Sequence, residues 1–186
     1  MSYTFSRRDF MKLSALTAVA VAGAGLFTGC GSNPNRPVGK IGDTLSPGSR
    51  ICDATLLGGD DVPTYDAAGK KLVCKFKIYT RVGQLQITKE HFQVNVTDAE
   101  GKEHRYYNGV QGITVVVDGG SATGLDQYKE VTPTLTKTGI EDLDQAKSVK
   151  VSYIPKMYAN GSITDSYSDV FATWDITSAM VKDTNA

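Results

Sequence analysis

The strongest constraint on the fold is a period-two alternation of apolar and polar residues in several short segments. The segment 71–80 reads Lys-Leu-Val-Cys-Lys-Phe-Lys-Ile-Tyr-Thr, and 92–97 reads Phe-Gln-Val-Asn-Val-Thr. Successive side chains of a strand point to opposite faces, so this pattern predicts strands with one buried face. Helical periodicity is nearly absent beyond residue 30, and we therefore expect an all-β protein.

Turn signals separate the predicted strands. Asp98–Gly101 predicts a tight turn between two paired strands, Asn160-Gly161 predicts a hairpin, and Glu141–Ala146 predicts a short turn. Pro133 favours an edge position for the strand that contains it. The predicted strands are 49–57, 71–80, 92–97, 103–107, 113–117, a segment around 131–135, 149–153 and 171–176. Seven or more short strands with frequent turns indicate an antiparallel β-sandwich.

The first thirty residues predict an export signal. Ser6–Lys12 is a basic segment, and Leu13–Gly29 is an uncharged run rich in Ala, Val and Gly. Arg7, Arg8 and Phe10 match the twin-arginine consensus. A transmembrane helix needs roughly 20 strongly apolar residues, so this shorter, glycine-containing run is better explained as a cleaved signal.

Cys30 is the predicted site of lipid attachment. It closes the segment Phe27-Thr28-Gly29-Cys30, which resembles a bacterial lipobox, where cleavage before the cysteine leaves it to carry diacylglycerol. We therefore expect a lipid-anchored protein on the extracytoplasmic face of a cell membrane. The expected organisation is a signal peptide (1–29), the lipidated cysteine with a polar tether (30–48), a β-sandwich (49–180) and a flexible tail (181–186).

Composition disfavours a nucleic-acid partner. Removing residues 1–29 takes away three of 20 basic and one of 20 acidic residues, which leaves 157 residues with a net charge of −2. No cluster of Lys or Arg suggests a nucleic-acid site. The length suits one domain with a substantial core.

Two readings are open for Cys52 and Cys74. If 49–57 and 71–80 pair antiparallel about Pro63, the two cysteines lie opposite each other and a disulfide is feasible. The alternative is two buried free thiols that act as small hydrophobic side chains.

A resemblance to a known family begins at Ile87–His104. This segment combines a polar turn, Phe92-Gln93-Val94 and Asp98-Ala99-Glu100-Gly101-Lys102, and it resembles the central part of telokin-like, immunoglobulin-fold bacterial lipoproteins of unknown function. The resemblance covers roughly Val38–Val117, whereas Asp118–Gln145 departs from it. It implies an immunoglobulin-like sandwich in the cell envelope, with no catalytic residues to carry over.

No cofactor or metal site is expected. The only histidines, His91 and His104, have no second ligand two to four residues farther along the chain, and the residues after Cys74 do not fit a blue-copper site. We expect His91 to cap a turn and His104 to face solvent. No Cys-x-x-Cys-His haem motif or Gly-x-Ser-x-Gly elbow is present.

Other residue patterns favour ordinary surface roles. The acidic pairs Asp60/Asp61 and Asp142/Asp144 fit surface loops better than catalytic carboxylates. The tyrosines near turns and late strands are either exposed contact residues or half-buried strand residues; they are Tyr106, Tyr107, Tyr153, Tyr158 and Tyr167.

The sequence therefore predicts a non-catalytic binding or interaction module of the envelope, with a protein or envelope component as its partner. The alternatives are an accessory subunit of an exported redox or transport complex, or a hydrolytic enzyme.

Overall fold

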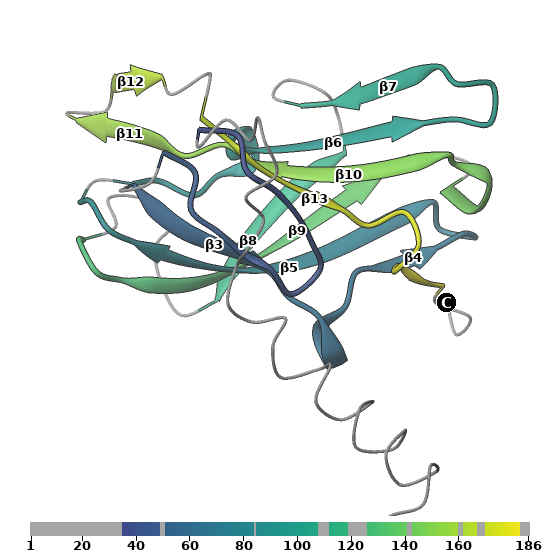
Figure 1. Cartoon of the computed structure of the whole chain (residues 1–186), viewed down its shortest axis with the longest axis horizontal. Coiled ribbons are helices and arrows are strands. Elements are labelled where there is room, and N and C mark those ends of the chain that lie inside the picture. The colour runs from purple at the N-terminus through teal and green to yellow at the C-terminus, as the bar shows by residue number, and fades with distance from the viewer. Residues whose placement is uncertain are drawn as a thin grey trace, which may run out of the picture. The chain divides into compact units, whose positions relative to one another are not determined.

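The described part of the chain is an all-β sandwich of two layers (Figure 1). The computed structural model describes residues 35–48, 51–83, 85–107, 112–118, 126–140, 143–159, 162–166 and 170–182. Its helical turns are three 3₁₀ segments: η1 (Gly59–Asp61), η2 (Lys89–His91) and η3 (Leu143–Gln145). Within these residues no helix is long and apolar enough to cross a membrane.

The first sheet has the strand order β1-β13-β10-β6-β7. All of its pairings are antiparallel except β1 with β13, which is parallel. Its strands are β1 (Val38–Lys40), β13 (Ala172–Asp175), β10 (Ser148–Tyr153), β6 (Phe92–Thr97) and β7 (Glu103–Tyr106).

The second sheet is built around the ten-residue strand β5 (Lys71–Thr80). One edge of β5 pairs with β9 (Glu130–Thr138), which in turn pairs with β8 (Ile113–Asp118). The other edge pairs with β3 (Cys52–Leu56) and β4 (Thr64–Asp66) over different parts of its length. Two short strands complete the sheet, β2 (Thr44–Leu45) on β3 and β14 (Val181–Lys182) on β4.

A separate hairpin joins β11 (Lys156–Ala159) to β12 (Ser162–Ser166). Ala159 pairs with Ser162, so two residues connect the strands, and the hairpin expected at Asn160-Gly161 is confirmed although those two residues lie outside the described part.

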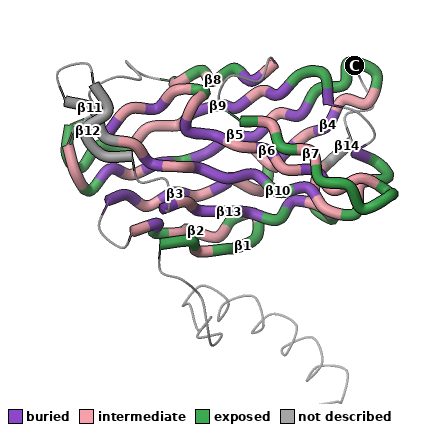
Figure 2. Tube along the Cα trace, turned by 90° about the horizontal axis from the view of Figure 1, so that it is seen from above, coloured by how far each residue is buried: buried purple, intermediate pink, exposed green. Residues whose placement is uncertain are grey.

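The alternation in sequence becomes an alternation in burial (Figure 2). Along β5 every second side chain from Leu72 to Thr80 is buried, and the same holds for Phe92, Val94 and Val96 on β6. These faces meet between the layers. The predicted all-β sandwich is therefore confirmed.

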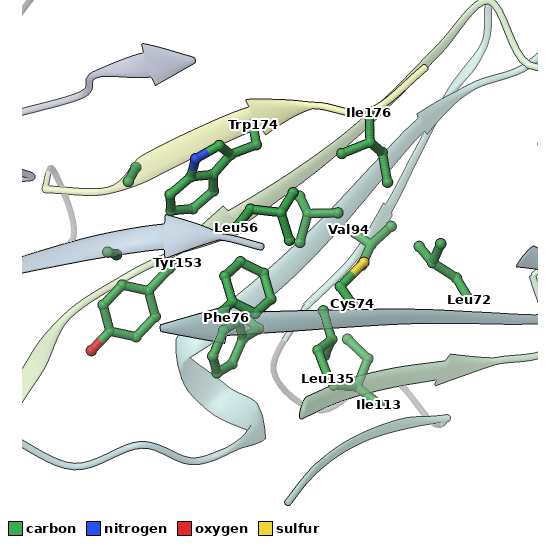
Figure 3. Packing of buried hydrophobic residues seen from close by; sticks show 14 of the residues in the cluster. Leu56, Leu72, Cys74, Phe76, Val94, Ile113, Leu135, Tyr153, Trp174 and Ile176 are labelled. Carbon is green, nitrogen blue, oxygen red and sulfur yellow. The ribbon is translucent and has the colours of Figure 1, made fainter. Parts of the chain in front are cut away.

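Aromatic side chains link the two layers at the centre of the core (Figure 3). The ring centroid of Phe76 on β5 lies 5.1 Å from that of Phe92 and 5.6 Å, edge-on, from that of Trp174. Tyr153 extends the cluster, 5.3 Å from Phe92. Each of these side chains is 0% exposed. Tilted and edge-on pairs at these distances add stabilisation beyond the area that they bury.

The strand register separates the two cysteines, and the alignment about Pro63 was wrong. β3 and β5 do pair antiparallel, but Cys52 lies opposite Thr80, six residues along β5 from Cys74. Six residues of strand span about 20 Å, far more than a disulfide bridges. Both thiols are free and buried. Burial raises the pKa of Cys52 to about 12 and that of Cys74 further, so both act as apolar core residues.

Pro133 does not lie on an edge strand, contrary to the expectation. β9 is flanked by β5 and β8, and Pro133 is buried opposite Val117. The pairing with β5 is interrupted there, between Lys75–Thr134 and Ile78–Val131. The interruption allows a central strand to hold a residue without a backbone N–H.

The folded domain also begins earlier and ends later than expected. Residues 38–45 contribute β1 and β2, one to each sheet, whereas the sequence predicts a polar tether over 30–48. Val181 and Lys182 pair with β4, whereas the sequence predicts a flexible tail over 181–186. Neither end carries the long apolar alternation that identified the other strands, because these strands are short and lie at sheet edges.

Replacing Tyr153 with Phe is expected to leave stability unchanged or raise it, by up to about 2 kcal/mol. The Tyr153 hydroxyl is buried and has no hydrogen-bond partner among the described residues, so the phenol bears a desolvation cost that Phe avoids. Burial also raises the pKa of this phenol well above its ordinary value. Urea unfolding of Tyr153→Phe tests this, and a loss above about 1 kcal/mol would mean that the hydroxyl has a partner.

Candidate functional site

The turn between β6 and β7 is organised by one carboxylate. The Asp98 backbone N–H donates to the Lys102 carbonyl (3.0 Å), and the Gly101 N–H donates to the Asp98 carbonyl (3.0 Å). The Lys102 N–H donates to Asp98 Oδ1 (2.8 Å). Gly101 adopts φ +91°, which favours glycine. The tight turn expected at Asp98–Gly101 is confirmed, and it leaves Oδ2 of Asp98 directed at β7.

That second oxygen contacts His104. Nε2 of His104 lies 2.8 Å from Asp98 Oδ2, and the two side chains are 38% and 25% exposed. The hydrogen bond with His104, aided by backbone donors of the turn, lowers the pKa of Asp98. Asp98 therefore stays ionised, and its contribution to stability is lost only as the pH falls through this lowered pKa. His104 is on the returning strand, as expected, but it is paired and only partly exposed to solvent.

An open pocket of about 420 Å³ lies beside this pair. Such a volume is within the range of small-molecule sites. Val96 and Tyr106 provide apolar surface, and the other side chains are mostly polar. The lining residues are Val96, Asp98, Ala99, Glu100, His104, Tyr106, Gly139 and Gln145.

A buried lysine supports the tyrosine of this pocket. Lys137 on β9 is 2% exposed, and its Nζ lies 4.3 Å from the ring centroid of Tyr106 on β7. The ammonium also donates to the Thr138 carbonyl. Burial lowers the pKa of Lys137. A cation over an aromatic face stabilises both groups, more so where water is excluded, so Lys137 fixes the position of the Tyr106 ring.

Gly112 makes room for this arrangement. A Cβ there would lie 2.5 Å from the Thr138 carbonyl oxygen and 3.2 Å from Lys137 Nζ, and the residue adopts φ +90°. A side chain at this position would therefore displace the lysine.

The pocket lies at the end of the first sheet opposite to the point where the chain enters it. β1 runs parallel to β13 and in the same direction as β6. Its first residue, Val38, pairs with Thr173, Thr173 pairs with Ser152, and Ser152 pairs with Gln93 of β6, so Val38 and Gln93 lie at the same level of the sheet. Asp98 is five residues farther along, or about 16 Å at the usual rise per residue. Figure 1 shows the β6–β7 turn at one end of the layer and the β11–β12 hairpin at the other.

The described side chains of the pocket can be compared with the groups that hydrolases use. A His–Asp pair activates a Ser, Thr or Cys nucleophile in hydrolases, and none of these residue types is among the described residues that line the pocket. A glycosidase needs a carboxyl whose pKa is raised, whereas the pKa of Asp98 is lowered. The described residues hold no group of three or more His, Cys, Asp or Glu that suits a metal ion.

The remaining candidates from the sequence are dispersed. Cys30, Arg7, Arg8 and Phe10 lie outside the described residues. Asp61 pairs with Lys75 at 2.6 Å, on the surface.

The tyrosines divide between core and surface. Tyr153 is in the core and Tyr107 is 52% exposed, whereas Tyr106 lines the pocket. The side chains of Tyr158 and Tyr167 lie outside the described part.

His91 serves the fold, as a cap of η2. Its Nδ1 accepts from the Thr88 N–H (3.2 Å), which with the Thr88 side chain forms a capping box. The expected capping role of His91 is confirmed.

Lys137 and Gln145 were not identified from the sequence. A signal for Lys137 was present, because Thr134-Leu135-Thr136-Lys137-Thr138 alternates and puts the lysine on the face of Leu135. Gln145 had no comparable signal, since a short turn shows no side-chain periodicity.

Comparisons with known proteins give little beyond the fold. No protein-family model and no curated protein matches the chain. One solved structure, an uncharacterized β-sandwich protein from Clostridium difficile 630, is similar at 12% identity and a TM-score of 0.38, covering 76% of this chain and 94% of that one. The class that the strands themselves define is an all-β sandwich with an open polar pocket at one end.

Proposed function

We propose that this chain is a lipid-anchored envelope protein that acts as a non-catalytic binding module. The observation that carries the proposal is the spacing between Cys30 and the domain. The described structure begins at Asn35, whose carbonyl accepts from the Phe171 N–H, and β1 follows at Val38. Five residues span at most about 17 Å. A lipid on Cys30 would therefore hold the domain close to the membrane rather than on a long tether.

The direction of the chain supports a binding role. Because β1 enters the sheet at the end away from the β6–β7 turn, the pocket lies at the other end of the sheet from the first described residues that follow the proposed anchor. Contacts with β13 and the residue before it secure that entry, since the Arg36 guanidinium lies 5.1 Å from the Phe171 ring centroid and the Pro37 carbonyl accepts from the Thr173 N–H (3.0 Å).

Replacing Cys30 with Ala is expected to release the domain from the membrane, because a protein without its acyl chains loses the apolar contact that holds it there. Fractionation of cells that express Cys30→Ala or the unaltered chain measures this. Retention of most of the Cys30→Ala protein in the membrane fraction would contradict lipid anchoring.

Replacing Arg7-Arg8 with Lys-Lys is expected to reduce export strongly, because the twin-arginine route reads the paired arginines. Export of the Lys-Lys variant at the unaltered level would assign the chain to the general secretory route, with the anchor unchanged. Mass spectrometry of the membrane-extracted protein provides the matching control, since acylation adds its mass to the peptide that begins at Cys30.

A further inference from the structure

We infer that the pocket beside the β6–β7 turn binds a neutral saccharide, with Tyr106 as its stacking surface. The inference rests on the proposed binding role and names the ligand class. The relevant observations are the position of the tyrosine, the balance of charge and the supply of hydrogen-bonding groups.

Tyr106 presents a held aromatic surface. It is half-buried on β7, and Lys137 lies over its ring at 4.3 Å and is not itself part of the pocket lining. The ring therefore uses part of its surface for the lysine and part for the pocket. The C–H groups of a sugar ring carry a partial positive charge and pack against an aromatic face, which is partly negative. A ring that is already fixed loses little entropy when the sugar binds.

The charges around the pocket are nearly balanced. Asp98 is engaged by His104 and by the turn, so Glu100 is the remaining acid among the described residues of the lining. Lys147 lies close to the turn, since a Cβ on Gly101 would be 3.7 Å from its Nζ. With the Lys137 ammonium already over Tyr106, a cationic ligand would meet like charge. An anionic ligand would meet Glu100. A neutral ligand avoids both costs.

The polar groups suit hydroxyls. The Gln145 amide both donates and accepts, and the Glu100 carboxylate accepts. With Nε2 of His104 directed at Asp98, Nδ1 is its second ring nitrogen, which can form a hydrogen bond with a hydroxyl. A hydroxyl donates and accepts, so a polyhydroxylated ring can satisfy this mixed set.

The test uses the two histidines of the chain as reporters. The full-length protein, extracted in detergent and labelled with ¹⁵N, is titrated with maltotriose, cellotriose or triacetylchitotriose while the imidazole signals are recorded. We expect at least one trisaccharide to shift the His104 signals in a saturable way, with no change for His91, which is buried in η2. His104→Gln assigns the signals. A response to triacetylchitotriose alone would specify N-acetylated sugars, and a response to the other two would specify unsubstituted hexoses.

A matched pair of tyrosine variants tests the stacking surface. Tyr106→Ala should weaken binding by at least about tenfold, whereas Tyr107→Ala, the exposed neighbour outside the pocket lining, should leave the affinity within about twofold. Tyr106→Phe retains the ring and should retain binding. Thermal melting identifies any variant that does not fold. If Tyr106→Ala does not fold, the Tyr106→Phe variant tests the stacking surface, and loss of binding in Tyr106→Phe would contradict it.

The inference is overturned if no trisaccharide shifts His104 at concentrations up to about 10 mM, or if Tyr106→Ala and Tyr107→Ala weaken binding equally. Spermidine and a trisaccharide of galacturonic acid are titrated in parallel, and saturable binding of either charged probe in place of the neutral ones also overturns it. These outcomes leave membrane anchoring through Cys30 untouched, because release of Cys30→Ala is measured without any ligand.

Discussion

A chain that begins at Ser49 is expected to lose about 5 kcal/mol of stability, a large part of what a domain of this size has. The reason is that residues 38–45 are structural. β1 completes the edge of the first sheet and β2 that of the second. Trp174 Nε1, on a fully buried side chain, donates to the Asp43 carbonyl at 3.0 Å. Deleting the acceptor leaves a buried donor without a partner, which alone costs about 1–3 kcal/mol.

Apolar contacts add to this loss. Ile41 and Leu45 pack against the core, and their removal exposes the side chains that they cover. A chain that begins at Ser32 is the matched control, since it retains the Asn35–Phe171 and Pro37–Thr173 hydrogen bonds and should unfold at the same urea concentration as the longer chain. Equal midpoints for the Ser49 and Ser32 chains would contradict a structural role for 38–45 and restore the tether reading.

Stability is expected to fall by about 3 kcal/mol as the pH is lowered from 6.5 to 4, and His91 is the cause. Burial, assisted by the charge of Lys156, lowers the pKa of His91 from 6.5 to about 4, although a backbone hydrogen bond with Gln86 opposes the shift. In the unfolded chain His91 binds a proton below pH 6.5, whereas in the folded chain it remains neutral until about pH 4. Protons therefore favour the unfolded state across this interval.

The chain supplies its own control, because it has only two histidines. His91→Gln removes the titrating group and should flatten the stability profile between pH 6.5 and 4, at some cost in absolute stability from the altered cap of η2. His104→Gln should preserve the slope in this interval. Urea midpoints measured at half-unit pH steps compare the three proteins. A slope that persists in His91→Gln and disappears in His104→Gln would contradict the prediction, because it would show that His104 causes the pH dependence of stability.

The sequence predicted the strands well where one face of a long strand is buried. The segments 71–80 and 92–97 match β5 and β6 residue for residue, because each places apolar residues on alternate positions against the core. It was less informative for β1, β2 and β14, which have two or three residues each. Such strands are stabilised by their neighbours, so their own residues show no period.

Strand register was beyond local reasoning. The segment between β3 and β5 contains η1 and β4. The midpoint of the pairing is therefore at Asp66, the last residue of β4, and not at Pro63, and Cys52 faces Thr80. The register of β3 against β5 depends on the pairing of the whole sheet, including β9 on the other edge of β5.

By itself, the sequence determined the all-β class, the order of the main strands and the turn at Asp98–Gly101, since alternation and turn chemistry act over a few residues. Only the tertiary structure decided that the cysteines remain apart, that Pro133 occupies a central strand and that Lys137 supports Tyr106 beside His104. Lys137 and Tyr106 are 31 positions apart and lie in different sheets. Their contact depends on how two layers pack, and no local pattern in the chain encodes that.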